Sequence, residues 1–380
     1  MTSRERVIKA MNMEKPDRVP VMCQFSIGFM NQQVKETGIT PMELWYDVEK
    51  YAETLVFLRE RFDFDGILVT LFGHDLNWRK KIKKLESVDG VERATFEDRV
   101  ETFVDNDLLV GKFFNDRKQN IDEVDIDEIP EVLDYIPASK GCYIFIDNTD
   151  PYKIFKILDE KLKGEFSLHA EVTSPLDYLL DLLGYEEGLI AMMLNPEKVN
   201  KILERFTVGV VNMAKGLAAL DNVDAVKISS PFAGMGFISP EFYRMFELPY
   251  LTKIVDAIKS MGKPVYVHTC GEIDDRLEIM AESGVSGLEC LDPPPIGNTE
   301  LDDAFDRVGD KIFIKGNVDS VNTLLNGSDN KIKEDVENRI KTGMKNKGFI
   351  LSTACSIAPE VPKENIQALS KIIKKIGVYK

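Results

Sequence analysis

The chain has 380 residues, of which 44% are hydrophobic and 29% are charged, and 64 Asp and Glu against 48 Lys and Arg give a formal net charge of −16. A phosphate backbone binds basic surfaces, so this acidic balance argues against nucleic-acid binding. No apolar run reaches the ~18 residues that cross a bilayer, and the opening MTSRERVIKAMNMEK lacks a signal-peptide core, so we expect no membrane span and a cytoplasmic protein. The five cysteines are odd in number and scattered, which is not typical of a disulfide framework.

Eight short β-rich segments follow one another along the chain, with helical patterns between them. Helix starts are marked by Ser174, Asn195 and Ser239, each directly before a proline, which suits the first position of a helix. Strands that alternate with helices predict an α/β protein with a parallel sheet, and eight of them predict a (β/α)8 TIM barrel. We expect one domain over residues 1–380. The segments are RVPVMCQF, DGILVTLF, FSLHAEV, DAVKIS, PVYVHTC, SGLECLD, IFIKGN and GFILSTAC.

The second and third of these segments are separated by a long stretch rich in acidic residues and lysine. It includes NWRKKIKKLESVDGVERATFEDRVETF and NIDEVDIDEIPEVL. A connection of this length exceeds an ordinary loop of a barrel. We therefore predict an elaborated insertion, partly hairpin, on the barrel rim at about residues 75–160.

A histidine and a cysteine stand two residues apart at the end of the fifth segment. In an extended strand, residues i and i+2 face the same side, so His268 and Cys270 converge. Cys355 ends the eighth segment, and active sites of such barrels lie at the carboxyl ends of the strands. One imidazole and two thiolates are a typical zinc set that leaves a fourth position open. We predict one catalytic zinc ion at these three residues.

The remaining cysteines and one carboxylate are weaker candidates. Cys290 ends the sixth segment and competes as a ligand, although a small buried core residue is the interpretation that we favour. Cys23 and Cys142 have no converging partner. Glu171, near the carboxyl end of the third segment, is a candidate for a fourth, displaceable zinc ligand and for a catalytic group. The alternative for Glu171 is a salt-bridged carboxylate inside the barrel.

With these residues in view, the chain resembles the uroporphyrinogen decarboxylase (URO-D) superfamily, and within it the zinc- and corrinoid-dependent methyltransferases. The family's His-x-Cys and distant Cys fall on His268, Cys270 and Cys355. The resemblance implies an eight-stranded barrel, one zinc ion per chain and a corrinoid carried by a partner protein. It rests on RERVIKAMNMEKPDRVPV, SPEFYRMFELPYLTKIVDAIKSMGKPVYVHTCG, GNVDSVNTLLNGS and GFILSTACSIAPEVPKENIQAL.

Decarboxylation is the least favoured of the activities that the resemblance implies. The decarboxylases carry an arginine-rich segment after the first strand, and the corresponding VMCQFSIGFMNQQVK has no arginine. Ser229 and Ser230 stand where the decarboxylases have an aspartate. A protein without those guanidinium groups is poorly suited to a substrate with many carboxylates.

Two directions of methyl transfer then stay open. In the first, a methoxylated aromatic compound gives its methyl group to the Co(I) of a corrinoid protein, which makes the chain the methyltransferase component of an O-demethylase. In the second, methylcobalamin gives the methyl group to a small thiol such as coenzyme M. The long insertion and the apolar Phe25, Phe29 and Phe72 favour the aromatic substrate, because a ring needs an apolar pocket.

Overall fold

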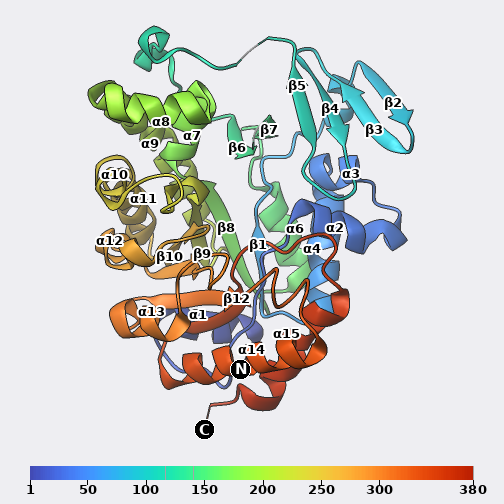
Figure 1. Cartoon of the computed structure of the whole chain (residues 1–380). Coiled ribbons are helices and arrows are strands. Elements are labelled where there is room, and N and C mark those ends of the chain that lie inside the picture. Colours follow the sequence, from blue (N-terminus) through green and yellow to red (C-terminus); the bar gives the residue numbers. More distant parts are fainter. Residues whose placement is uncertain (116, 140, 380) are drawn as a thin grey trace.

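The computed structural model describes residues 1–115, 117–139 and 141–379, and a parallel seven-stranded sheet lies at its centre (Figure 1). The strands correspond to seven of the eight predicted segments and confirm the α/β barrel class. Hydrogen bonds join them in the order β1-β8-β9-β10-β11-β12-β13. Their bounds are β1 (Gly66–Val69), β8 (Ser167–Thr173), β9 (Ala225–Ser229), β10 (Val265–Thr269), β11 (Gly287–Cys290), β12 (Phe313–Val318) and β13 (Phe349–Thr353).

The first predicted segment takes the eighth place of the barrel without forming a regular strand. Val21 makes an isolated parallel bridge to Leu351 in β13. Phe25 makes another to Ile357, which lies beyond the end of that strand. On the other side, the amide of Asp65, directly before β1, donates to the carbonyl of Val21 at 2.8 Å. Pro20, the third residue of the segment, has no amide hydrogen to donate to a neighbouring strand, which interrupts the pairing.

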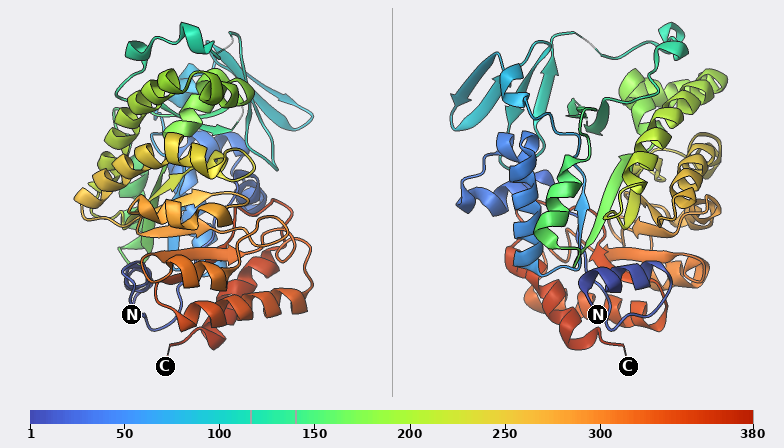
Figure 2. Two further views of the ribbon diagram at one scale, coloured as in Figure 1. Left: turned by 60° about the vertical axis from the view of Figure 1, so that its left-hand side comes forward. Right: turned by 180° about the vertical axis from the view of Figure 1, so that it is seen from behind.

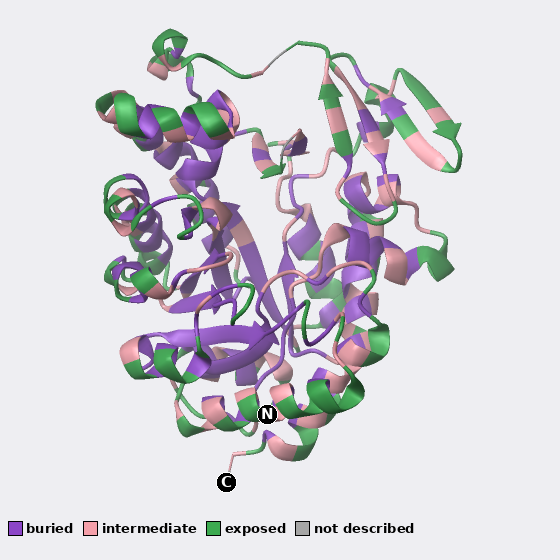
Figure 3. Ribbon diagram, viewed as in Figure 1, coloured by how far each residue is buried: buried purple, intermediate pink, exposed green. Residues whose placement is uncertain are grey.

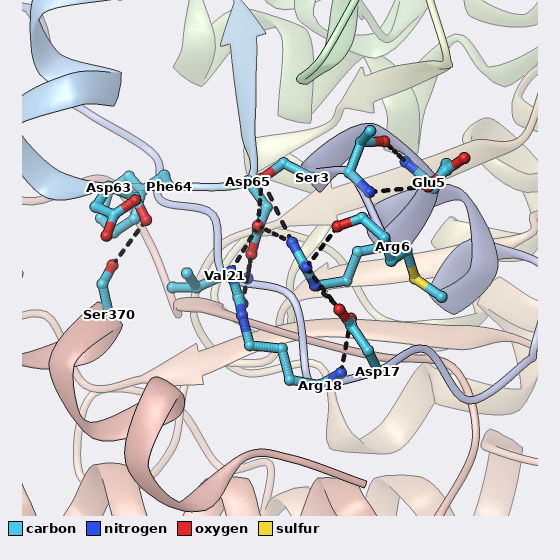
Figure 4. A network of polar contacts seen from close by, with 12 residues as sticks. Ser3, Glu5, Arg6, Asp17, Arg18, Val21, Asp63, Phe64, Asp65 and Ser370 are labelled. Carbon is cyan, nitrogen blue, oxygen red and sulfur yellow. Dashed lines mark hydrogen bonds and ion pairs between the residues drawn. The ribbon is translucent and has the colours of Figure 1, made fainter.

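A buried ion network fixes this segment at the bottom of the barrel (Figure 4). The carboxylate of Asp65 accepts hydrogen bonds from Arg6 and Arg18 and from the amide of Val21, each at 2.7–2.8 Å. Arg6 also binds Asp17 at 2.7 Å. Since one carboxylate joins the first helix, the bridging segment and β1, the start of the chain is held against the strand that it neighbours.

Helices pack on the outside of the sheet, and the views of Figure 2 show them surrounding the strands. The helices that follow Ser174, Asn195 and Ser239 begin at the prolines as predicted; the two serine side chains accept amide hydrogens, and Asn195 makes no side-chain cap. The helices are α1 (Ser3–Met11), α2 (Ile27–Val34), α3 (Pro41–Tyr46), α4 (Val48–Phe62), α5 (Trp78–Lys81), α6 (Lys153–Leu162), α7 (Pro175–Leu183), α8 (Tyr185–Leu194), α9 (Pro196–Ala218), α10 (Pro240–Phe246), α11 (Leu248–Ser260), α12 (Leu277–Glu282), α13 (Leu301–Val308), α14 (Asp329–Lys345) and α15 (Lys363–Ile376). Short 3-10 turns are η1 (Lys35–Thr37), η2 (Ile121–Glu123), η3 (Ile126–Glu128), η4 (Pro231–Ala233) and η5 (Asp274–Arg276).

The connection between β1 and β8 carries two further antiparallel sheets at one end of the barrel (Figure 1). The larger sheet has the order β2-β3-β4-β5, and β6 and β7 form a hairpin. The β-structure of this connection is more extensive than the partial hairpin that the sequence predicts. The strands are β2 (Lys84–Val88), β3 (Val91–Thr95), β4 (Arg99–Phe103), β5 (Val110–Phe113), β6 (Tyr135–Ser139) and β7 (Cys142–Phe145).

Burial follows these layers, because the strands of the barrel are buried except for the half-buried Glu171 and Ser229, and the outer helices expose one side (Figure 3). A few charged side chains lie inside the barrel, among them Lys227, Glu289 and Lys315, each at most 1% exposed. None of the helices in the described part of the chain combines the length and apolar composition that a bilayer crossing requires.

Candidate metal centre

Four potential ligand atoms converge at the carboxyl ends of three barrel strands. His268 lies in β10 and Cys270 directly follows it, Cys290 ends β11, and Cys355 follows β13. One nitrogen or sulfur atom from each of the four lies within 4.8 Å of the others. His268 Nε2 is 3.2 Å from Cys270 Sγ, which is 3.6 Å from Cys355 Sγ. The structure therefore brings together the three predicted ligands and adds Cys290.

These separations suit a tetrahedral ion. With Zn–S bonds of about 2.3 Å and Zn–N bonds of about 2.1 Å, tetrahedral geometry places ligand atoms roughly 3.6–3.8 Å apart. All five cysteines of the chain are free thiols, so the sulfur donors are available. Interactions with the side chains of Cys270 and Cys290 hold the pKa of the Cys355 thiol well below its ordinary value, which favours a thiolate. An imidazole and soft sulfur donors at this spacing fit zinc.

The orientation of His268 is set by a neighbouring carboxylate. His268 and Glu289 are directly opposite each other on β10 and β11, and His268 Nδ1 lies 3.0 Å from Glu289 Oε2. Burial would raise the pKa of Glu289, but Lys315 and Lys227 outweigh it and hold this pKa well below its ordinary range. The ionised carboxylate accepts the Nδ1 hydrogen, which leaves Nε2 pointing at the thiols. A carboxylate behind a ligand histidine is a common support of zinc sites.

The position of Cys290 depends on an unusual backbone conformation. Consecutive residues of a strand face opposite sides, so Glu289 and Cys290 would point apart in a regular strand. Cys290 and Leu291 instead have φ values of +85° and +54°, which end the strand and turn the thiol toward the cluster. The Cys290 thiol donates to Asp292 Oδ2 at 3.1 Å, and the same oxygen accepts from the amide of Gly271 at 2.7 Å.

Glu171 lies in strand β8, and its carboxylate pairs with a lysine and does not join the cluster. Lys227 is its cross-strand neighbour, and Lys227 Nζ lies 3.2 Å from Glu171 Oε2. The four clustered ligand atoms do not include Glu171. The structure thus shows the ion pair that the sequence allowed as the alternative. A place for Glu171 at the metal stays a prediction.

A cavity of about 460 Å³ opens beside the cluster, and His268, Cys270 and Cys355 form part of its wall. Its wall also includes residues 106–108 and parts of the hairpin of β6 and β7, so the connection between β1 and β8 helps to enclose it. Phe25 lines this cavity. Phe29 is fully buried and stacks on Phe25 with ring centroids 5.5 Å apart.

Phe72 takes a different position from the one predicted. It is buried and lines a neighbouring cavity of about 530 Å³ together with Trp45, which borders both spaces. Neither Phe29 nor Phe72 is among the described residues that line the cavity beside the cysteines. The prediction treated the three phenylalanines as one pocket because sequence position after a strand does not reveal on which side of a wall a ring lies.

The sequence interpretation missed the charged residues that support the site. Lys227, Glu289 and Lys315 each stand in the middle of an apolar strand, and charged residues are almost never fully buried unless they are paired. That pattern was the available signal. It indicates ion pairs within the barrel, and the structure shows them between Glu289 and both lysines.

Comparison with known proteins identifies the family and several relatives of the chain. A family model described as uroporphyrinogen decarboxylase (URO-D) matches residues 2–71 and 149–376. The chain is 25% identical, over 98% of both sequences, to the methylcobamide:CoM methyltransferase MtbA of Methanosarcina acetivorans. It is 33% identical to the uroporphyrinogen decarboxylase of Hydrogenovibrio crunogenus, over 40% of this chain and 42% of that one.

A solved structure shares the fold over the whole chain. It is a methyltransferase from Methanosarcina mazei, with a TM-score of 0.74, 19% sequence identity and coverage of 99% of both chains. At this identity the likeness concerns the fold. The family model leaves residues 72–148 unmatched, and this is the part that carries β2 to β7.

Proposed function

The chain belongs to the uroporphyrinogen decarboxylase (URO-D) family, and we propose that this corrinoid-dependent methyltransferase moves a methyl group between a corrinoid protein and a small thiol held at a zinc centre. The observation that carries the proposal is the cluster of His268, Cys270 and Cys355 in the wall of a cavity. The similarity to a methylcobamide:CoM methyltransferase over 98% of both chains supports the thiol as methyl acceptor.

The chain's own residues have separate tasks in this proposal. His268, Cys270 and Cys355 would hold the zinc ion, and Glu289 keeps the imidazole turned toward it. A bound zinc ion would lower the pKa of a thiol substrate and keep its sulfur in place. The cavity encloses the rest of the substrate, which limits access of water to the reacting sulfur.

The transfer balances as a displacement at carbon. The thiol releases its proton to solvent, its sulfur forms a bond to the methyl carbon, and the cobalt–carbon bond of the methylated corrinoid breaks with its electron pair left on cobalt. The same geometry serves the reverse direction, in which Co(I) attacks a methyl group. The corrinoid acts here as a substrate carried by the partner protein.

A methoxylated aromatic substrate is the second candidate. The cavity volume of about 460 Å³ exceeds the need of a small thiol, and Phe25 and Trp45 give it apolar walls that suit a ring. In that case Co(I) would attack the methyl carbon, and the aryl oxygen would leave with the bonding electrons. Decarboxylation of a substrate with many carboxylates has no such support, because the described residues that line the cavity include no arginine.

The function is tested with the zinc-loaded protein and free cobalamins as substitutes for the corrinoid protein. Methylcobalamin with 2-mercaptoethanol should be consumed, with methyl thioether and cob(I)alamin as products that absorbance and mass spectrometry detect. Cob(I)alamin with 2-methoxyphenol tests the second candidate through formation of methylcobalamin and catechol. A protein that contains one zinc ion and catalyses only the second reaction would overturn the thiol assignment. Failure of both reactions would overturn the methyl transfer.

A further inference from the structure

A buried carboxylate of the cavity wall has an oxygen without a partner. Asp177 lies in the first turn of α7, is 6% exposed and lines the cavity beside the metal cluster. Within the described part of the chain, its Oδ2 atom has no hydrogen-bond partner. An unsatisfied buried carboxyl oxygen costs free energy, so such an atom in a cavity points to a ligand that completes it.

Two neighbouring carboxylates, unlike Asp177, have partners within the protein. Glu171 Oε2 makes no hydrogen bond within the described part of the chain, but it lies 3.2 Å from Lys227 Nζ in an ion pair. Glu247 accepts hydrogen bonds from the hydroxyl groups of Ser174 and Ser230, both at 2.7 Å. Among these three carboxyl groups of the described chain, Asp177 is the one whose unpartnered oxygen has neither a hydrogen bond nor an ion pair.

The charge around Asp177 is negative. Burial raises its pKa well above the ordinary value, and the charges of Glu247 and Glu171 raise it further. The described residues that line the cavity include Glu171, Asp177 and Asp107 but no lysine or arginine. Of these three carboxylates, Lys227 offsets the charge of Glu171 alone, so an anionic ligand would be repelled by Asp177 and Asp107, whereas a cation would be attracted to them.

The apolar part of the wall agrees with this preference. The rings of Phe25 and Trp45 border the cavity. The face of an aromatic ring attracts a cation, and the attraction is strongest at sites that exclude water. The cavity therefore offers a cationic group a carboxylate and aromatic residues in one wall lining.

We propose that Asp177 binds a positively charged group of the substrate, so that the small molecule docked at the metal centre is an organic cation, such as a thiol with an ammonium group. This deepens the proposed function and rests on it for the role of the thiol. Asp177 is then a specificity-determining residue: its carboxylate receives the cation at one end of the cavity while the thiol reaches the cysteines.

Three thiols that share the two-carbon backbone test the charge preference: 2-aminoethanethiol, 2-mercaptoethanol and 2-mercaptoethanesulfonate. Calorimetric titration of the zinc-loaded protein should give the tightest binding for the ammonium compound and the weakest for the sulfonate. A hydrogen bond to a charged group contributes about 1.5–3 kcal/mol, so we expect at least about a tenfold difference in dissociation constant between these two.

Variants separate the contribution of Asp177. Asp177→Asn should weaken binding of the ammonium thiol by about tenfold or more and change binding of 2-mercaptoethanol by less than about threefold. Asp181→Asn is the matched control, since Asp181 is on the same helix and binds the hydroxyl of Tyr143 at 2.6 Å outside the cavity lining. Asp181→Asn should bind the three thiols in the same order of affinity as the wild-type protein. Circular dichroism establishes that both variants are folded.

Two compounds without a thiol group separate the cation site from the methyl-transfer chemistry. Propylammonium and propanesulfonate, which have no thiol, should show the same order of affinity without any contact to zinc. A sulfonate that binds as tightly as the ammonium compound in both pairs would overturn the role of Asp177, even with zinc and methyl transfer intact. Absence of zinc with the charge order preserved would overturn the metal centre and leave the cation site standing.

Discussion

Replacement of Glu289 by glutamine tests the support behind the metal centre. This carboxylate is 1% exposed and contacts Lys315, Lys227 at 3.3 Å and His268 Nδ1 at 3.0 Å. In Glu289→Gln, Lys227 keeps its ion pair with Glu171, whereas Lys315 loses the carboxylate that it contacts. Removing one member of a buried ion pair costs about 3–5 kcal/mol, and we expect a loss of this size in the free energy of unfolding.

The same substitution should weaken zinc binding for a different reason. A neutral amide accepts the His268 Nδ1 hydrogen less strongly than a carboxylate and can present its amino group instead. Loss of such a support typically lowers metal affinity by about 10–100-fold. Competition with a chromophoric chelator measures the zinc affinity, and urea denaturation measures the stability.

A double variant distinguishes the two effects. Burial already lowers the pKa of Lys315 despite the contact with Glu289. Its ammonium group is therefore the charge that loss of the Glu289 carboxylate destabilises most. Glu289→Met combined with Lys315→Met should recover most of the stability, because it removes the unpaired charge, yet it should still bind zinc weakly. Wild-type zinc affinity in Glu289→Gln, or an unchanged urea midpoint, would refute the role assigned to this carboxylate.

Three further predictions concern other residues of the site. Cys270→Ala and Cys355→Ala should each stay folded and lose most of the zinc, whereas Cys290→Ala should keep it; metal analysis that finds Cys290→Ala empty would make that thiol an essential ligand. Glu171→Gln should retain zinc and lower methyl transfer by roughly one to two orders of magnitude, and wild-type turnover would remove Glu171 from the reaction. Burial raises the pKa of Glu247 to about 7, so the folded protein holds a proton that the unfolded chain releases above its ordinary value of 4.5. The free energy of unfolding should therefore fall by about 3 kcal/mol as the pH rises from about 4.5 to 7, and denaturation of Glu247→Gln should show no such fall.

The sequence alone predicts which site residues converge where the two-residue period of a strand sets the direction of the side chains. His268 and Cys270 face one side because strand residues alternate, and Cys355 joins them because parallel strands end at the same edge. The barrel followed from the count of apolar segments. The first of these segments was predicted as a strand, but Val21 and Phe25 form only isolated bridges, since pairing depends on neighbours that no local pattern describes.

Other features depend on tertiary contacts or on special backbone angles. The thiol of Cys290 reaches the cluster through a φ of +85°, a conformation that a strand pattern does not predict. The pairing of Glu289 with His268 depends on the register between β10 and β11. Phe72 follows β1 and Phe25 ends the segment of isolated bridges, yet the two residues line different cavities, which no local sequence pattern reveals.

The thiol cluster has a consequence for the oxidation state of the protein. Cys270 Sγ and Cys355 Sγ lie 3.6 Å apart and both residues are half-buried, so a small movement would allow a disulfide between them. An oxidant and a zinc ion therefore compete for the same sulfur electron pairs, and a cystine would remove two donors at once. Metal-free protein kept in air should lose its capacity for zinc, and a thiol reductant should restore it, whereas the bound ion protects the cysteines.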